Sequence, residues 1–348
     1  MSGARHSLRD HGLRIGDLEA GPRCSIADVD GVRAGHVTVV RDEPDPPAGR
    51  GVARSGVTAI APGDPATLAR ESLRAGVAVL NGAGEMTGSI QIAEWGVLET
   101  PVYLTATMSV GRVYDGAVAA AVAADPAIGV DAVVIPVVGE CDDSWLSDAR
   151  VVQVDAQDAG RALADADADF AEGAVGAGTG MVCFDFKGGI GSASRRAGDA
   201  TVGALVLTNF GERRHLRIGG VPVGRLLGDG AATRPHPAGS CIAVVATDAP
   251  VGSADLARIA RRAGLGLART GSTGHHGSGE IFLAFSTARG PVEAVDVDAL
   301  FEATVDATEE AVVNSLWSAG TTTGREGRVA PALPHDAVLE LLARHGRL

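Results

Sequence analysis

The amino-acid sequence predicts an α+β protein in which helices cover two sheets. Short apolar runs rich in β-branched residues have the length of strands; some alternate with helical segments, and others follow one another directly. With 45% apolar residues over 348 positions, the chain has ample material for a core. Its 48 glycines and 3% aromatic residues indicate thin layers with close backbone approaches. Since no linker or internal repeat interrupts it, we expect residues 1–348 to form a single domain.

In the first half of the chain, predicted strands alternate with helices. Asp30-Gly31 predicts a turn between two short strands, because glycine tolerates the backbone conformation that such turns need. Asp64 followed by Pro65 is typical of a helix start. The pattern predicts strands over 57–61, 77–80, 102–105, 132–138 and 151–154, and helices over 65–75, over an alanine-rich segment ending near Asp125, and over 156–172.

The second half begins with three apolar runs, over 181–186, 202–207 and 242–246, with no helical pattern between them, which predicts a block of strands. A helix is expected from Ser253, because apolar residues recur there at helical spacing. This apolar stripe consists of Leu256, Ile259, Ala260, Ala263 and Leu267. A strand over 281–285, a long helix over 297–318 and a short helix over 336–344 complete the prediction.

The formal net charge of −13 argues against nucleic acid or an anionic membrane surface as a partner, because both require a basic footprint. The chain has no uninterrupted apolar run of membrane-spanning length, and its N-terminus lacks the apolar core of a signal peptide. We therefore expect a cytoplasmic protein with a small substrate. Cys24, Cys141, Cys183 and Cys241 lack metal-ligand spacing, so they are expected to be reduced and mostly buried.

A candidate nucleophile lies where a proline-punctuated loop meets an apolar run. Gly239 and Ser240 form this junction, and the serine opens the run. If the bond between them is cut, Ser240 becomes a chain terminus whose hydroxyl can attack a carbonyl and whose α-amine can act as the base. An ordinary loop-to-strand junction has the same pattern, and these residues alone favour that simpler interpretation.

Polar residues near the ends of predicted strands offer partners for such a nucleophile. Ser278 and Glu280 are two positions apart on an extended segment, so they face the same side and can form a hydrogen-bonded pair. Asn209 is a candidate donor to an oxyanion, and Glu140 is a candidate acceptor for a substrate ammonium. Each has a simpler alternative: a capped loop for Ser278 and Glu280, an ordinary strand end for Asn209, and a solvated acid for Glu140.

Two other motifs suggest a metal site and a dinucleotide-binding loop, but their spacing and context do not fit these functions. His275, His276 and Glu280 invite a metal site, but adjacent histidines point apart on an extended chain and no HExxH spacing exists, so no metal is expected. The glycines of 176–180 superficially resemble a dinucleotide-binding loop. That loop needs a preceding strand and a following helix, whereas the order here is reversed, which favours a tight connecting loop.

Together these residues resemble the DmpA-type aminopeptidase family, which includes L-aminopeptidase/D-esterases and β-peptidyl aminopeptidases. The resemblance covers nearly the whole chain. The matching segments are residues 26–36, 54–60, 81–88, 186–191, 239–250, 277–282, 314–316 and 323–327. It implies a four-layer αββα sandwich similar to N-terminal nucleophile hydrolases. It also implies self-cleavage into chains 1–239 and 240–348 and a homo-oligomer, a tetramer of processed heterodimers.

Residue roles follow by the same analogy. The resemblance implies that Ser240 is the nucleophile, that Ser278 and Glu280 assist it, and that Asn209 lines the oxyanion hole. Glu140 is expected to receive the free amine of the substrate.

Two positions depart from the family pattern, in which tyrosine usually stands where this chain has Trp145 and asparagine is common where it has Ala106. We expect Trp145 to contact substrate, but an indole cannot accept or relay a proton as a phenol can. An auxiliary hydroxyl role is therefore not expected at that position.

The resemblance implies an aminopeptidase, amidase or esterase that releases N-terminal α- or β-amino acids from short substrates through an acyl-enzyme on Ser240. No metal or organic cofactor is expected. Two alternatives stay open: an ω-amino-acid oligomer hydrolase of the same fold, and an unprocessed small-molecule-binding protein without activity.

Overall fold

The computed structural model describes residues 7–228 and 239–348. The strands of the large sheets are β1 (Arg33–Asp42), β2 (Val52–Ala61), β3 (Leu73–Gly82), β4 (Val97–Leu98), β5 (Val102–Ala106), β6 (Val137–Cys141), β9 (Ile190–Ala197), β10 (Ala200–Asn209), β11 (Ser240–Thr247) and β12 (Gly279–Ser286). Two small hairpins pair β7 (Val182–Cys183) with β8 (Phe186–Lys187) and β13 (Thr322–Thr323) with β14 (Val329–Ala330). The helices are α1 (Pro65–Leu68), α2 (Ser89–Trp95), α3 (Val110–Ala124), α4 (Gln157–Ala164), α5 (Val223–Leu226), α6 (Ser253–Thr270), α7 (Val297–Trp317) and α8 (His335–Arg344).

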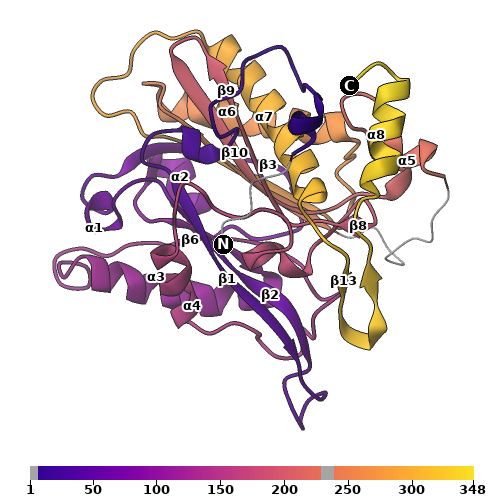
Figure 1. Ribbon diagram of the computed structural model, residues 1–348. Helices are drawn as coiled ribbons and strands as arrows, with labels where there is room; N and C mark the ends of the chain where they lie inside the picture. Colours follow the sequence, from indigo (N-terminus) through magenta and orange to yellow (C-terminus); the bar gives the residue numbers. More distant parts are fainter. Residues whose placement is uncertain (1–6, 229–238) are drawn as a thin grey trace.

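These elements form four layers (Figure 1). The four-stranded sheet has the order β1-β2-β5-β6, and the six-stranded sheet has the order β4-β3-β12-β11-β10-β9. Side chains of both sheets meet in one apolar cluster, so the sheets pack face to face. Helices α3 and α4 cover the outer face of the smaller sheet, and α6 and α7 cover that of the larger one. The expected αββα sandwich is confirmed.

Strand β11 lies inside the six-stranded sheet and is buried on both faces. Ile242 and Val244 point into the cluster between the sheets, whereas Ala243 and Val245 pack beneath the helices α6 and α7. Because both faces are covered, the strand is a continuous apolar run in the sequence rather than an alternating one. The same burial fixes the register of the strand, and therefore the place of its first residue, Ser240.

Glycine allows the layers to approach closely, as its abundance predicts. A Cβ atom on Gly191 of β9 would lie 1.9 Å from the carbonyl oxygen of Ala311 on α7. On β3, a Cβ atom on Gly76 would lie 2.3 Å from the backbone nitrogen of Ala257 on α6. Since real Cβ atoms are not found at such distances, helices at this spacing need glycine in the strands below them.

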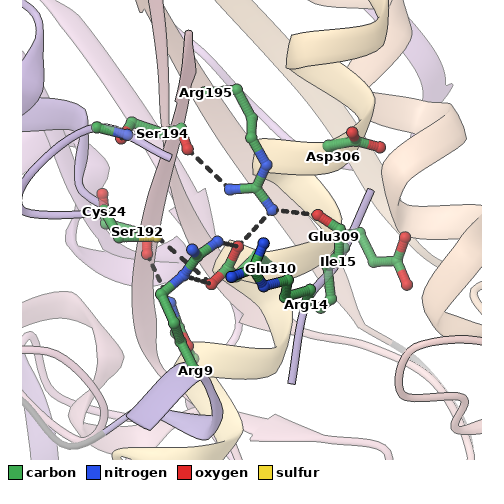
Figure 2. A network of polar contacts seen from close by, with 12 residues as sticks. Arg9, Arg14, Ile15, Cys24, Ser192, Ser194, Arg195, Asp306, Glu309 and Glu310 are labelled. Atoms are coloured by element: carbon green, nitrogen blue, oxygen red, sulfur yellow. Dashed lines mark hydrogen bonds and ion pairs between the residues drawn. The ribbon is translucent and has the colours of Figure 1, made fainter. Parts of the chain in front are cut away.

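A buried ionic network joins β9, α7 and the N-terminal segment (Figure 2). Arg195 is fully buried, forms an ion pair with Glu310 and donates to the backbone oxygen of Ile15 at 2.6 Å. Arg9 binds the same carboxylate at 3.1 Å. Burial raises the pKa of Glu310, but Arg195 and Arg9 outweigh this effect and hold that pKa below its ordinary value. The network anchors the chain ahead of β1 to the six-stranded half of the sandwich.

Two sequence predictions in the first half are wrong in part. The segment before Asp30-Gly31 is a short 3-10 turn, Ile26–Asp28, rather than a strand, because Ser25 and Asp28 satisfy backbone N–H groups of this turn reciprocally. The helix predicted over 65–75 ends at Leu68, and β3 begins at Leu73. Leu73 is buried in the cluster between the sheets, and this packing overrides the local helical pattern.

Other boundaries also differ from the sequence prediction. The strand predicted over 132–138 begins only at Val137 and continues to Cys141 as β6, because Val133 and Ile135 lie on the surface. Residues 151–154 form no strand; Gln153 instead donates to two backbone carbonyls of the neighbouring loops. The helix over 156–172 ends at Ala164, and the run over 181–186 is a hairpin, since Phe184 and Asp185 have positive φ angles. Strand β9 was not predicted, because its serines and arginines hide the apolar pattern.

Within the described residues, no helix combines the length and the apolar character that crossing a membrane requires. All four cysteines are free; Cys141, Cys183 and Cys241 are buried and Cys24 is partly buried, as expected.

Candidate active site

The candidate site lies at one end of the inner strands of the six-stranded sheet, where β11 and β12 begin and β10 ends. Ser240 is paired with Asn209 in the antiparallel direction and with Gly279 in the parallel direction. This register brings three segments together that are far apart in the sequence, as the sequence interpretation requires. The Ser240 side chain itself is nearly buried, with 6% of the residue exposed.

The backbone N–H of Gly279 is shared between two oxygens of this junction. It donates to the carbonyl of Gly239 at 3.1 Å and to Oγ of Ser240 at 3.3 Å. A donor at the carbonyl polarises the carbon that a nucleophile would attack. The attacking hydroxyl and the carbonyl of the preceding residue are therefore held by one group. The proline-punctuated segment before Gly239 lies outside the described residues.

Gly239 also has a steric role that the sequence did not reveal. A Cβ atom at this position would lie 1.9 Å from the carbonyl oxygen of Asn209 on the adjacent strand. A side chain would therefore push residue 239 away from the end of β10 and from the Gly279 donor. Glycine is required here for the close approach of two backbones, in addition to leaving its own carbonyl unshielded.

Ser278 and Glu280 form the hydrogen-bonded pair expected from their spacing. The Ser278 hydroxyl donates to Oε1 of Glu280. Glu280 is fully buried, and among the described residues its Oε2 has no hydrogen-bond partner. Burial raises the pKa of Glu280, whereas the bond from Ser278 and the nearby His275 lower it, and the net shift is upward. A buried carboxylate with a raised pKa is a suitable proton acceptor.

Asn81 on β3 fixes the turn that presents this pair, a role that the sequence analysis did not assign. Its Nδ2 donates to the carbonyls of His275 at 2.8 Å and Ser278 at 2.6 Å. The pairing of β3 with β12 shifts by one residue between Glu280 and Ile281, which is the signature of a β-bulge. Such bulges redirect side chains, and this one lies directly at the carboxylate. No local pattern around Asn81 signals such a bulge.

Asn209 links the end of β10 to two neighbouring segments. Its Nδ2 donates to the carbonyl of Asp142 at 2.7 Å, and its Oδ1 accepts from the backbone N–H of Val182 at 3.0 Å. The side chain is thus fixed beside Ser240, and its role as an oxyanion donor stays a prediction.

Glu140 reaches the site from the opposite sheet. It lies on β6 and is 2% exposed; its two oxygens accept from the backbone N–H of Glu85 at 2.9 Å and from the Thr107 hydroxyl. Gly84 fills the space between this carboxylate and β12, since a Cβ atom there would lie 3.0 Å from Oε1 of Glu140 and 3.3 Å from Cα of Gly279. Burial raises the pKa of Glu140, and so do its acidic neighbours. Among the described residues, no cationic side chain is bonded to this carboxylate, which lies across Gly84 from Gly279, the residue paired with Ser240.

Trp145 lies in the loop after β6, three residues beyond the Asp142 carbonyl that Asn209 binds. The guanidinium of Arg328 stacks over its ring at 4.4 Å, and Arg328 also donates to its carbonyl at 3.2 Å. The indole nitrogen is buried without a hydrogen-bond partner among the described residues. The loop is thus anchored to the C-terminal part of the chain, and substrate contact by Trp145 stays a prediction.

The glycine-rich segment 176–180 is a buried connecting turn around Lys187. The Lys187 amine donates to the carbonyls of Gly178, Met181 and Gly188 at 2.6–2.8 Å. Burial lowers the pKa of Lys187 to about 7. The three carbonyls match the three N–H bonds of an ammonium, so they favour the charged form of the side chain. The glycines therefore pack around a lysine of the same chain.

Comparisons with known proteins identify the chain. The model of "Peptidase family S58" matches residues 24–330. The chain belongs to peptidase family S58. It is 40% identical to the "Beta-peptidyl aminopeptidase BapA" of Sphingosinicella microcystinivorans, over 94% of this chain and 90% of that protein.

Two solved structures of aminopeptidases superpose on nearly the whole S58 chain. A β-aminopeptidase from Burkholderia sp. has a TM-score of 0.90 and 40% identity, over 98% of this chain and 99% of its own. The L-aminopeptidase D-Ala-esterase/amidase from Ochrobactrum anthropi has a TM-score of 0.89 and 36% identity, again over 98% and 99%. The latter is described as a new variant among the Ntn hydrolase fold. The expected family, fold and enzyme class are confirmed, and neither alternative function is favoured.

Replacing Glu280 by glutamine is expected to change how the stability of the fold depends on pH. In the wild type, a pKa of Glu280 above its unfolded value means that the folded state binds more protons between the two values. Its stability therefore falls as pH rises above the ordinary glutamate pKa of about 4.3, and E280Q lacks that loss. The free energy of unfolding of E280Q relative to wild type should therefore increase over this range, as measured by urea denaturation. The exposed Glu94 provides the matched control, E94Q; equal pH profiles for E280Q, E94Q and wild type would contradict the raised pKa.

Proposed function

We propose that this protein is a self-processing aminopeptidase that releases the N-terminal residue, β-amino acids included, from short peptides and amides. The observation that carries the proposal is the junction at Ser240, where one backbone donor contacts both the candidate nucleophile and the Gly239 carbonyl. The relatives named as β-aminopeptidases, 40% identical to this chain, support the substrate class.

In the proposed maturation, Oγ of Ser240 attacks the carbonyl carbon of Gly239. The C–N bond between the two residues breaks, the amide nitrogen takes the hydroxyl proton and becomes an amine, and an ester joins Gly239 to Oγ. Water then hydrolyses this ester, leaving a carboxylate on Gly239 and a free α-amine on Ser240. The Gly279 N–H is suited to stabilise the oxyanion of the first step, because it already donates to this carbonyl.

The same hydroxyl then acts on substrates. The α-amine of Ser240, with an ordinary pKa of about 7.7–8.0, accepts the hydroxyl proton, and the Ser278–Glu280 pair assists proton transfer. Asn209 and the Gly279 N–H donate to the oxyanion, and hydrolysis of the acyl-enzyme releases the amino acid.

Glu140 gives the proposed enzyme its preference for a free N-terminus. In the part of the chain that the structure describes, the charged groups that act on the pKa of this buried carboxylate, Asp142 and Glu85, are both acidic. A substrate ammonium would supply the missing positive charge and form a charge-assisted hydrogen bond. This arrangement favours removal of one terminal residue over internal cleavage. Assembly as a homo-oligomer and location in the cytoplasm stay predictions.

The function is tested by comparing β-alanyl-p-nitroanilide, L-alanyl-p-nitroanilide and their N-acetylated forms as substrates. We expect the wild type to release p-nitroaniline only when the amine is free, and S240A to be inactive. E140Q should lower kcat/KM for the free-amine substrates by about 10–100-fold, the worth of a hydrogen bond to a charged group. The exposed Glu94 on α2 is the control, as E94Q. Equal turnover of the acetylated substrates would contradict the role of Glu140, and activity in S240A would contradict the proposed function.

Gly239→Ala should slow maturation without preventing folding of the sheets. An added Cβ atom would lie 1.9 Å from the carbonyl oxygen of Asn209 at the end of β10. Relieving this clash displaces residue 239 and moves its carbonyl away from the Gly279 donor. Loss of one oxyanion donor costs about 10²–10³ in rate, so we expect slower cleavage of that order, followed by gel electrophoresis over time. Gly252→Ala is the control, since its Cβ would meet only the side chain of Val292, at 3.7 Å. Cleavage of G239A at the wild-type rate would rule out this steric requirement.

A further inference from the structure

A cluster of metal-binding residue types lies next to the loop that ends in Ser278. It consists of Glu212, beyond the end of β10, His215 in the 3-10 turn Arg213–His215, and His275 in the loop between α6 and β12. One ligand atom of each side chain lies within 4.8 Å of the others. Nε2 of His275 lies 3.3 Å from Oε1 of Glu212. The sequence analysis did not group these residues, because some 60 positions separate His275 from the other two.

The donor set matches a transition metal. Two imidazoles and one carboxylate are a common zinc set, with a fourth position left for water. Metal–ligand distances of about 2.0–2.2 Å in a tetrahedron place ligand atoms roughly 3.3–3.6 Å apart. Glu212 and His275 already have this spacing. All three ligand atoms lie within 4.8 Å of one another, so a closure of roughly 1 Å brings them to this spacing.

Two further observations fit a metal-binding role. Nδ1 of His215 is buried without a hydrogen-bond partner among the described residues, although a buried ring nitrogen normally has one. Nε of Arg214 binds Oε2 of Glu212 at 2.8 Å, so the other oxygen is the one directed at His275. Outer contacts of this kind orient the carboxylates that hold metals.

The backbone around the cluster is also fixed. The carbonyl of His275 accepts from the backbone N–H of Ser278 and from Asn81, each at 2.8 Å. On the other side, a Cβ atom on Gly271 would lie 1.9 Å from the carbonyl of His215, so the two segments that supply the ligands are in close contact. A shared ion would therefore cross-link the segment after Asn209 to the loop that carries Ser278.

We propose that Glu212, His215 and His275 form a binding site for a divalent transition-metal ion of the zinc class. The site is separate from the proposed catalytic residues and uses none of them as ligands. This proposal differs from the sequence-based expectation that the protein binds no metal. That expectation rested on His275, His276 and Glu280 alone.

The test is isothermal titration of the tag-free full-length protein, as purified and after chelator treatment, with zinc chloride. One ion should bind, and H215A should weaken binding by about 100-fold or more, because even outer contacts are worth about 10–100-fold in metal affinity. His276 is the matched control, since it is exposed and next to His275 but outside the cluster. H276A should bind zinc as the wild type does.

Thermal unfolding with and without zinc provides the second readout. Zinc should raise the Tm of wild type and H276A and leave that of H215A unchanged, because an ion stabilises only the state that binds it. If H215A is poorly folded without zinc, E212Q replaces it in both measurements. Absence of zinc binding by the wild type, or equal losses in H276A and in the cluster variants, would overturn the proposal. Neither readout depends on peptidase activity.

Discussion

The parallel pairing of the first residues of β11 and β12 is the constraint on which the site depends. Opposite Ser240 lies Gly279, and the Gly279 N–H reaches both Ser240 and the residue before it. This pairing exists because β11 is buried between a sheet and two helices, which leaves its register no freedom. The apolar core therefore positions a polar junction at the rim of the sheet, although no core residue takes part in the chemistry.

Two buried carboxylates give the rim its chemical character. Glu280 and Glu140 come from different sheets, and burial raises the pKa of each. Burying them costs stability, since within the described residues neither has a cationic side chain bonded to it. A free α-amine on Ser240 after cleavage, and an ammonium on a bound substrate, would each bring a positive charge to this region. Maturation and substrate binding are thus the events expected to offset the cost.

The sequence revealed those parts of the fold and site that depend on local patterns. The apolar run 242–246 predicted a strand, and the two-residue spacing of Ser278 and Glu280 predicted their contact. Features that arise from packing between distant segments were missed. Strand β9 is polar because Arg195 pairs with Glu310 on α7 (Figure 2), and the bulge beside Asn81 exists only through pairing with β12. The Glu212–His275 contact likewise needs the folded chain.

The central claim is that the protein cuts its own chain at the bond between Gly239 and Ser240. Intact-mass spectrometry of freshly purified wild type and S240A, combined with sequencing of new N-termini, tests it most directly. The account predicts two wild-type fragments, residues 1–239 and a chain that begins with Ser240, and one uncut chain for S240A. A wild type that stays a single chain after long incubation, or an S240A chain cut at the same bond, would contradict the account.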